Sequence, residues 1–155
     1  RIILGIDPGL GTAGYALVSF KDDKVKLLDY GVFRTDSDLC LHERLLVVHQ
    51  DMEKILEHFQ PTEAWVEDLF VGMNPKNAIK VAHARGVIVM TLAEHGLEPK
   101  ALSPTQVKVM VTGDGNADKR QMQDMLKKHF GLKVLPTPDD AADALGIAYA
   151  GAING

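Results

Sequence analysis

The first part of the chain alternates short apolar runs with turn signals. A β-branched run at positions 2–6 ends at Asp7 and a Pro-Gly pair, which predicts a buried strand stopped by a turn. Apolar runs at 15–20 and 25–33 flank the polar tetrapeptide 21–24, so a strand–turn–strand meander is expected there. Three consecutive strands therefore open the predicted fold.

After residue 38 the apolar positions recur every three or four residues, as in amphipathic helices. For the last of these helices, Thr137 is the expected N-cap and Pro138 the first helical residue. The pattern predicts short strands at 64–66 and 100–102, and helices at 39–59, 77–95, 104–112, 118–130 and 137–153. Strands first, then strands alternating with helices, indicate an α/β fold with a mixed sheet.

Size and composition narrow the class of protein. At 155 residues, 46% hydrophobic and 25% charged, residues 1–155 are expected to form one globular domain. The single cysteine, Cys40, excludes an internal disulfide framework and a multi-cysteine zinc site. No apolar run approaches the ~20 residues that a membrane span needs, so no membrane partner is expected and the cytoplasm is the expected location.

Charge is distributed unevenly along the chain. The net charge is −4, but residues 1–70 carry 7 basic and 13 acidic side chains, residues 71–133 carry 10 and 5, and residues 134–155 carry 3 acids. A basic middle between acidic ends fits a protein that holds a phosphate backbone with one region and metal with the others. The alternative is an ordinary solvated surface.

Residues 9–14 match the dinucleotide-binding pattern G-x-G-x-x-G and follow a predicted strand. That pattern binds a pyrophosphate only when a helix comes next. Here the next segment is rich in strand formers, and Asp7 would lie beside the pyrophosphate. We therefore expect the glycines to form a tight hairpin and to keep side chains out of a substrate groove.

Five acidic residues are candidate metal ligands. Asp7 and Glu67 each end a predicted buried strand, where an ionised carboxylate is unfavourable unless it is paired or binds a cation. Asp140 and Asp143 share one face of the last predicted helix, and Asp139 with Asp143 is an alternative pair. The helix dipole alone also explains Asp139 and Asp140, because it favours acids in a first turn.

Carboxylates without clustered histidines or cysteines suit Mg²⁺, with Mn²⁺ as a substitute. Two such ions can activate a water molecule and stabilise the leaving oxygen of a phosphodiester. Alanines beside the last acids should let their helix lie close against the sheet and bring those acids to strand ends. The pattern therefore indicates a metal-dependent nuclease whose site is formed by Asp7, Glu67, Asp140 and Asp143.

The same segments resemble the RuvC family of bacterial crossover junction endodeoxyribonucleases. Residues 3–9 resemble the family's opening strand, Glu67 with Phe70 its second acidic site, 82–87 its central helix and 140–145 its closing acidic motif. The resemblance extends in order over nearly the whole chain. It implies a ribonuclease-H-like fold, in which a mixed sheet of about five strands is flanked by helices.

The resemblance also implies a homodimer that resolves four-way (Holliday) DNA junctions in recombination and repair, with a branch-migration helicase complex as a partner. It implies catalytic and metal-binding roles for the four acids, with two Mg²⁺ ions per site. It implies DNA contacts at Phe70, Lys108 and Lys119. The alternatives are a core position for the phenylalanine and solvated positions for the lysines.

A dimer surface is indicated on the helix predicted at 77–95. Its small residues form a stripe at steps of three and four: Ala78, Ala82, Gly86, Val89 and Ala93. A glycine within a helix costs about 1 kcal/mol against alanine, which close approach of a second helix would offset. The alternative is that this stripe packs against the chain's own sheet.

Three other functions fit part of the pattern. A different ribonuclease-H-like nuclease, acting on RNA or an RNA–DNA hybrid, would use the same acids. A junction-binding module without catalysis would leave Glu67 and Asp143 unexplained. A sugar-kinase-like or actin-like ATPase has a phosphate hairpin resembling residues 7–14, but its fold needs two such domains.

Overall fold

A five-stranded mixed sheet forms the centre of the computed structural model, which describes residues 1–69, 72 and 74–155. The strands lie in the order β3-β2-β1-β4-β5. Neighbours β3, β2 and β1 are antiparallel, whereas β1, β4 and β5 are parallel. Their bounds are β1 (Ile2–Asp7), β2 (Thr12–Lys21), β3 (Lys24–Arg34), β4 (Glu63–Glu67) and β5 (Pro99–Leu102). The predicted meander and mixed sheet are confirmed.

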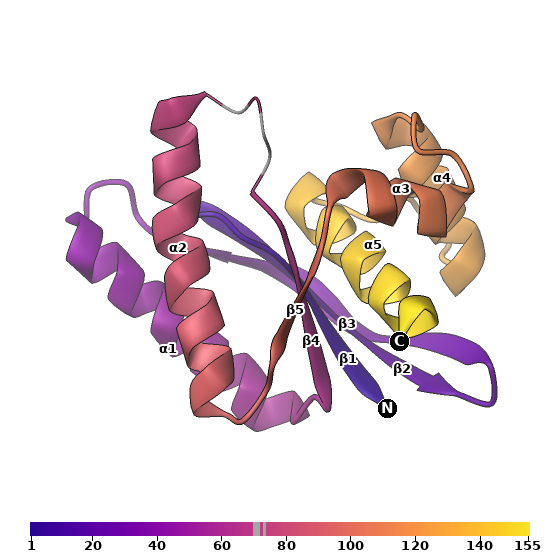
Figure 1. Cartoon of the computed structure of the whole chain (residues 1–155), viewed down its shortest axis with the longest axis horizontal. Coiled ribbons are helices and arrows are strands. Elements are labelled where there is room, and N and C mark those ends of the chain that lie inside the picture. The colour runs from indigo at the N-terminus through magenta and orange to yellow at the C-terminus, as the bar shows by residue number, and fades with distance from the viewer. Residues whose placement is uncertain (70–71, 73) are drawn as a thin grey trace.

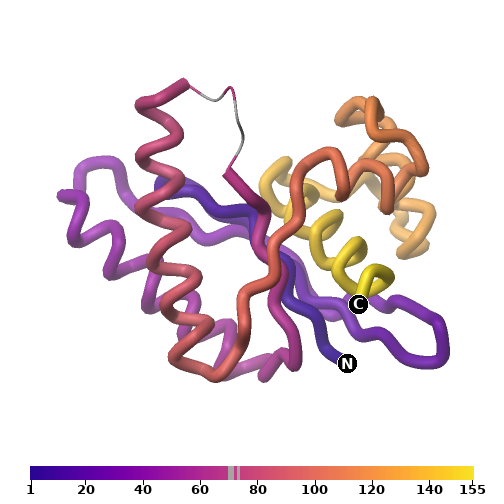
Figure 2. Tube along the Cα trace, in the orientation of Figure 1, coloured from indigo at the N-terminus to yellow at the C-terminus, as the bar shows by residue number. Residues whose placement is uncertain are grey.

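Helices cover both faces of the sheet (Figure 1). The chain forms α1 (Leu41–Phe59), α2 (Pro75–Glu94), α3 (Pro104–Thr112), α4 (Lys119–Phe130) and α5 (Asp139–Asn154). Figure 2 shows α1 and α2 on one side of the strands and α3, α4 and α5 on the other. Each layer has its own apolar core against the sheet. None of the helices within the described residues is long and apolar enough to cross a membrane.

Local sequence signals place the helix ends within two residues of their observed positions. Ser103 caps α3 by accepting from the backbone of Gln106, and Pro104 is the first helical residue, as predicted. The predicted start of the last helix is wrong by one residue. Pro138 is the N-cap of α5 and has an extended backbone (φ −69°, ψ 176°), so the helical turn begins only at Asp139 and Thr137 lies outside it.

The alternation of side chains along β1 and β4 determines which face the terminal acids occupy. Ile3 lies in the core formed with α5, whereas Ile6 lies in the opposite core formed with α1 and α2. Because successive side chains in a strand point to opposite faces, Asp7 points to the α5 face. Trp65 in β4 also lies in the core formed with α5, so Glu67 points to that face as well.

Helix α5 lies directly on the strands because two glycines leave room for its backbone. A Cβ built on Gly5 of β1 would overlap the backbone of Ala144 and Ala148. A Cβ built on Gly14 of β2 would overlap the carbonyl of Asp140. The predicted close approach of this alanine-rich helix is confirmed. The segment after Gly14 is strand, so residues 9–14 do not form a dinucleotide site.

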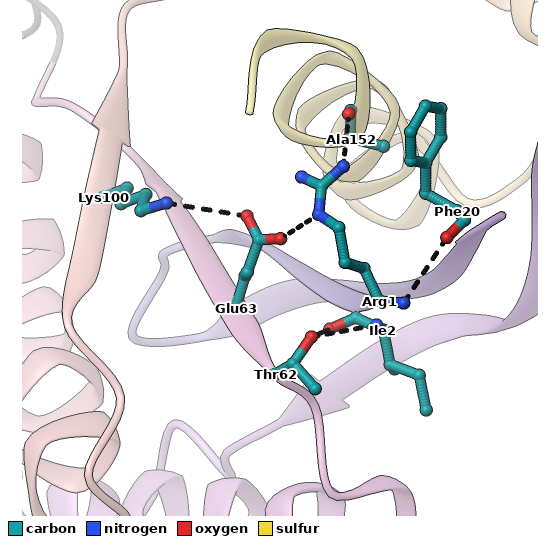
Figure 3. A network of polar contacts seen from close by, with 7 residues as sticks. All are labelled: Arg1, Ile2, Phe20, Thr62, Glu63, Lys100 and Ala152. Atoms are coloured by element: carbon teal, nitrogen blue, oxygen red, sulfur yellow. Dashed lines mark hydrogen bonds and ion pairs between the residues drawn. The ribbon is translucent and has the colours of Figure 1, made fainter. Parts of the chain in front are cut away.

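Polar contacts join the start of strands β1 and β4 to the carboxyl end of α5 (Figure 3). The guanidinium of Arg1 pairs with the carboxylate of Glu63 and donates a hydrogen bond of 3.2 Å to the carbonyl of Ala152. The ammonium of Lys100 lies 3.6 Å from the same carboxylate. These contacts fix the carboxyl end of α5, and its first turn is thereby held over the strand ends that carry the acids.

Candidate active site

Three segments far apart in sequence bring carboxylates to one place. Asp7 ends β1, and Glu67 ends the neighbouring parallel strand β4, where Ile6 pairs with Val66. The first turns of α5 add Asp140 and Asp143 from above the same strand ends. One carboxylate oxygen from each of Asp7, Asp140 and Asp143 lies within 4.8 Å of the others. We call Asp7, Glu67, Asp140 and Asp143 the carboxylate cluster.

The protonation of the cluster shows how closely its charges approach. Burial, followed by the negative charges of its three neighbours, raises the pKa of Asp7 from 3.8 to about 9. Burial also raises the pKa of Glu67 from 4.5 to about 6, against the hydrogen bond with Asp7, which lowers it. The pKa of Asp143 is raised by burial, while the charge of Lys119 opposes that shift. Without a cation, the cluster retains protons that solvent-exposed carboxyls would lose.

These residues are acidic groups that can hold a metal ion. Converging, part-buried carboxylates repel one another, and a bound cation removes that repulsion. All the donors are oxygen atoms, which Mg²⁺ and Mn²⁺ prefer over the nitrogen and sulfur ligands that suit softer ions. The donor chemistry therefore fits the divalent ions expected from the sequence.

Two further acids beside the cluster make other contacts. The carboxylate of Asp139 forms an ion pair with the ammonium of Lys119 at 2.8 Å. It also accepts a hydrogen bond of 3.3 Å from the side chain of Gln123. The lysine holds the pKa of Asp139 below its usual value. Asp68 is exposed and pairs with Arg85 at 3.4 Å. Of the two pairs left open by spacing, the structure therefore brings Asp140 with Asp143 to Asp7.

A cavity of about 250 Å³ opens beside the cluster between α3, α4 and α5. Glu67 and Asp143 line it together with Lys108 of α3 and Lys119 of α4. The charge of Lys108 lowers the pKa of Glu67, and that of Lys119 lowers the pKa of Asp143, so both ammonium groups act on the cluster. The two predicted lysines thus lie beside the carboxylate cluster. Phe70 lies outside the described residues.

Comparison with known proteins identifies the family. The sequence matches the family described as "Crossover junction endodeoxyribonuclease RuvC" over residues 3–150. The chain belongs to the RuvC family. A RuvC of Fusobacterium nucleatum is 43% identical over 145 residues, which cover 94% of this chain and 76% of that protein. A RuvC of Alkaliphilus oremlandii is 42% identical over 154 residues, which cover 99% and 94%.

Solved RuvC structures agree with the fold. The structure of Thermus thermophilus RuvC matches with a TM-score of 0.89 at 32% identity, covering 97% of this chain and 92% of that one. A second structure, of T. thermophilus RuvC in complex with a Holliday junction substrate, matches with a TM-score of 0.91 at 31% identity, covering 99% and 96%. The ribonuclease-H-like fold is confirmed.

Arg85 is a residue of this RuvC site that sequence reasoning missed. Its Nε atom donates a hydrogen bond of 3.2 Å to the backbone carbonyl of Glu67, and its Nη2 atom pairs with Asp68. Arg85 thus ties α2 to the strand end that carries a cluster acid. The sequence carries no specific signal for this contact, because its acceptor is a backbone carbonyl.

The raised pKa values predict how pH acts on the stability of the metal-free protein. The folded state binds the protons of Asp7 and Glu67 more tightly than the unfolded chain, whose values are 3.8 and 4.5. The protonated groups therefore stabilise the folded state fully below about pH 4. The contribution of Glu67 is lost as pH rises through about 6, and that of Asp7 is lost as pH rises through about 9. We expect the melting temperature in EDTA to fall across this range and to recover when Mg²⁺ is added at the alkaline end.

Calorimetry at a series of pH values, with EDTA or with Mg²⁺, measures this dependence. Asp7→Asn removes the group with the larger shift, so its melting temperature in EDTA should vary less with pH. An unchanged dependence in that variant would show that other groups cause it.

Proposed function

We propose that this protein is a structure-specific endodeoxyribonuclease that resolves four-way DNA junctions in recombination and repair. The observation that carries the proposal is the carboxylate cluster at the ends of β1, β4 and α5 in a chain of the RuvC family. Its relatives at 43% and 42% identity are crossover junction endodeoxyribonucleases, and the similar T. thermophilus RuvC has been solved with a Holliday junction substrate. In this proposal residues 1–155 form a single nuclease domain.

The carboxylate cluster would hold two Mg²⁺ ions, with Mn²⁺ as a substitute. When bound, such ions supply an activated water molecule and stabilise the charge that develops on the leaving oxygen. The role of the chain is to fix the ligands. Asp7 and Glu67 stand on neighbouring strands of the sheet, and Asp140 and Asp143 stand on a helix packed against those strands, so the donors are positioned before the substrate arrives.

Lys108 and Lys119 would bind the phosphodiester backbone beside the cluster. Both line the cavity that reaches the cluster, and ammonium groups there can offset the charge of the phosphate and of the reaction it undergoes. Lys119 is also held by Asp139, which limits its rotamers. From the family resemblance, we assign Phe70 the stacking contact with unpaired bases at the junction.

The homodimer would form through the outer face of α2. The inward side of this helix is formed by Ala84, Ile88 and Leu92, which are buried. Ala82, Gly86 and Ala93 are exposed, so they do not pack against the chain's own sheet. The side chains of Ile79 and Met90 lie on the same outer side and are 60% and 51% exposed. Apolar surface of this kind on a helix commonly marks a protein interface.

A two-fold dimer would present two equivalent sites to the two strands that must be nicked. We further propose that the dimer acts in the cytoplasm beside the chromosome and meets a branch-migration helicase complex there. Both statements rest on the proposed reaction.

The variant Gly86→Arg tests the dimer surface. A Cβ on Gly86 would meet no described atom within 4 Å, and arginine is a better helix former, so the folded monomer should not lose stability. A charged side chain between two apposed helices should raise the dimer dissociation constant at least about 10-fold. Sedimentation of this variant and of Gln50→Arg, a matched change on the exposed face of α1, measures the effect. Equal dissociation constants would place the interface elsewhere.

The variant Arg85→Met tests how Glu67 is positioned. Methionine keeps an apolar stem but loses the hydrogen bond to the carbonyl of Glu67, so we expect cleavage to fall about 10-fold and to need more Mg²⁺. Asp68→Asn is the matched control, because it removes only the exposed ion pair of Arg85 and should change cleavage little. If both variants behaved alike, the ion pair rather than the carbonyl contact would matter.

Nicking assays on three substrates test the function itself. With Mg²⁺, we expect paired nicks in a mobile four-way DNA junction and little cleavage of linear duplex DNA or an RNA–DNA hybrid. Preferred cleavage of the hybrid would identify a different ribonuclease-H-like nuclease. Metal-independent binding of the junction without nicking would identify a binding module.

A further inference from the structure

Two histidines and two glutamates gather where α1 packs against α2, on the opposite face of the sheet from the carboxylate cluster. His49 and Glu53 lie one turn apart on α1, Glu94 is the last residue of α2, and His95 is its C-cap. One ligand atom from each of His49, Glu53 and Glu94 lies within 4.8 Å of the others, and Oε1 of Glu94 lies 3.9 Å from Nδ1 of His49. The Nε2 atom of His95 lies 2.6 Å from Oε2 of Glu53. We call these four residues the histidine–glutamate cluster.

A buried threonine sets the tautomer of His49. The hydroxyl of Thr91 donates its only proton to the carbonyl of Val87, at 2.7 Å, within the same helix. Its oxygen also lies 2.9 Å from Nδ1 of His49 and must therefore accept a hydrogen bond from that nitrogen. In the neutral imidazole, the lone pair then resides on Nε2.

The lone pair of His49 faces a carboxylate. Its Nε2 atom lies 3.5 Å from Oε1 of Glu53. A lone pair and a carboxylate at this distance repel each other, and either a proton on Nε2 or a metal ion between the two atoms removes that repulsion. The arrangement matches a common feature of metal sites, in which a ligating histidine donates its other N–H to a protein oxygen that orients the ring.

We propose that the histidine–glutamate cluster is a second metal site that binds a transition ion such as Zn²⁺. Two neutral imidazoles and two carboxylates balance the charge of a divalent ion, and this set of nitrogen and oxygen donors suits Zn²⁺ rather than Mg²⁺. The carboxyl end of α2 lies at the site, and its carbonyl dipoles also favour a cation. The side chains of His49, Glu53 and His95 are each 27% exposed, so an ion can reach them from solvent.

The bound ion would join the middle of α1 to the end of α2. These two helices form the layer that covers one face of the sheet. Helix α2 also carries Arg85 and, on its outer face, the proposed dimer surface. A metal ion that links the two helices would therefore stabilise this layer. It would use none of the four acids of the carboxylate cluster as ligands.

Calorimetric titration with Zn²⁺ in the presence of millimolar Mg²⁺ tests the proposal, because Mg²⁺ competes for the carboxylate cluster. We expect one Zn²⁺ ion per chain. His49→Gln, His95→Gln and the more exposed Glu94→Gln should each weaken binding at least about 10-fold, whereas His42→Gln, on an exposed face of α1, should not. Zn²⁺ should also raise the melting temperature of the natural sequence more than that of His49→Gln.

Thr91→Val provides the sharpest test, because it keeps all four ligands and changes only the group that orients His49. We expect it to weaken Zn²⁺ binding about 10- to 100-fold, with circular dichroism confirming that each variant is folded. The proposal is overturned if the natural sequence binds no Zn²⁺ above its Mg²⁺-competed background. It is also overturned if His49→Gln and His95→Gln bind Zn²⁺ as the natural sequence does, since the contacts of Glu53 would then be simple hydrogen bonds.

Discussion

Asp7→Asn is expected to lower cleavage of a four-way junction at least about 100-fold, because about 3 kcal/mol or more of transition-state stabilisation depends on a correctly held metal ion. Asparagine has nearly the same volume as aspartate but lacks its charge. The substitution also removes the carboxyl group whose pKa is raised to about 9. The remaining carboxylates should then repel one another less, so the stability of the fold should not fall. Junction binding, which we propose depends on basic residues such as Lys108 and Lys119, should change little. Single-turnover cleavage and a binding assay in Ca²⁺ separate the two quantities.

The neighbouring acids of α5 provide a matched comparison for this prediction. Asp140→Asn should resemble Asp7→Asn, because Asp140 shares the cluster with it. Asp139→Asn should reduce cleavage less than about 10-fold, since it only releases Lys119 from an exposed ion pair. If Asp139→Asn were the more damaging change, the first turn of α5 would present the other acid to the metal.

Gly14→Ala is expected to weaken both folding and metal binding. A Cβ at this position would overlap the carbonyl of Asp140, which is backbone and cannot rotate away as a side chain can. Either α5 or β2 must shift, at a typical cost of about 1–3 kcal/mol of stability. The shift moves a cluster acid away from Asp7, the residue opposite Gly14 in the β1–β2 ladder. Thermal unfolding with and without Mg²⁺ should therefore show a lower melting temperature and a smaller increase on adding the ion.

Gly11→Ala is the control for this effect, because it lies in the same hairpin. A Cβ there would lie 3.5 Å from the guanidinium of Arg44, which is an ordinary contact. Its effect on stability should stay within about 0.5 kcal/mol. Similar losses in both variants would mean that the hairpin, rather than the contact with α5, is sensitive to added bulk.

The sequence predicted most of the fold because its signals are local. Periodicity located the strands and helices, and apolar runs that end in an acid marked Asp7 and Glu67 as the carboxyl ends of buried strands. The resemblance to RuvC added the family and the expected reaction. The start of α5 was misplaced by one residue, because Thr137 before proline is a good capping sequence whereas the backbone of Pro138 is extended.

Contacts between distant segments could not be predicted in this way. Asp139 and Asp140 are equivalent in spacing arguments, and only the ion pair with Lys119 of α4 distinguishes them. The hydrogen bond from Arg85 ends on a backbone carbonyl, which leaves no pattern in the sequence. The histidines show no ligand spacing among themselves, because the partners of His49 and Glu53 come from a second helix more than 40 residues away.

The alternation of β1 also affects how genes of this family can change. Substitutions between Ile3 and Asp7 alter packing, but the loss or gain of a single codon there would reverse the face on which every later side chain of the strand lies. Asp7 would then point into the core under α1 and α2, away from its three partners. Reading-frame-preserving insertions and deletions should therefore be rarer in this strand than in the β2–β3 turn, where added length leaves the acids in place.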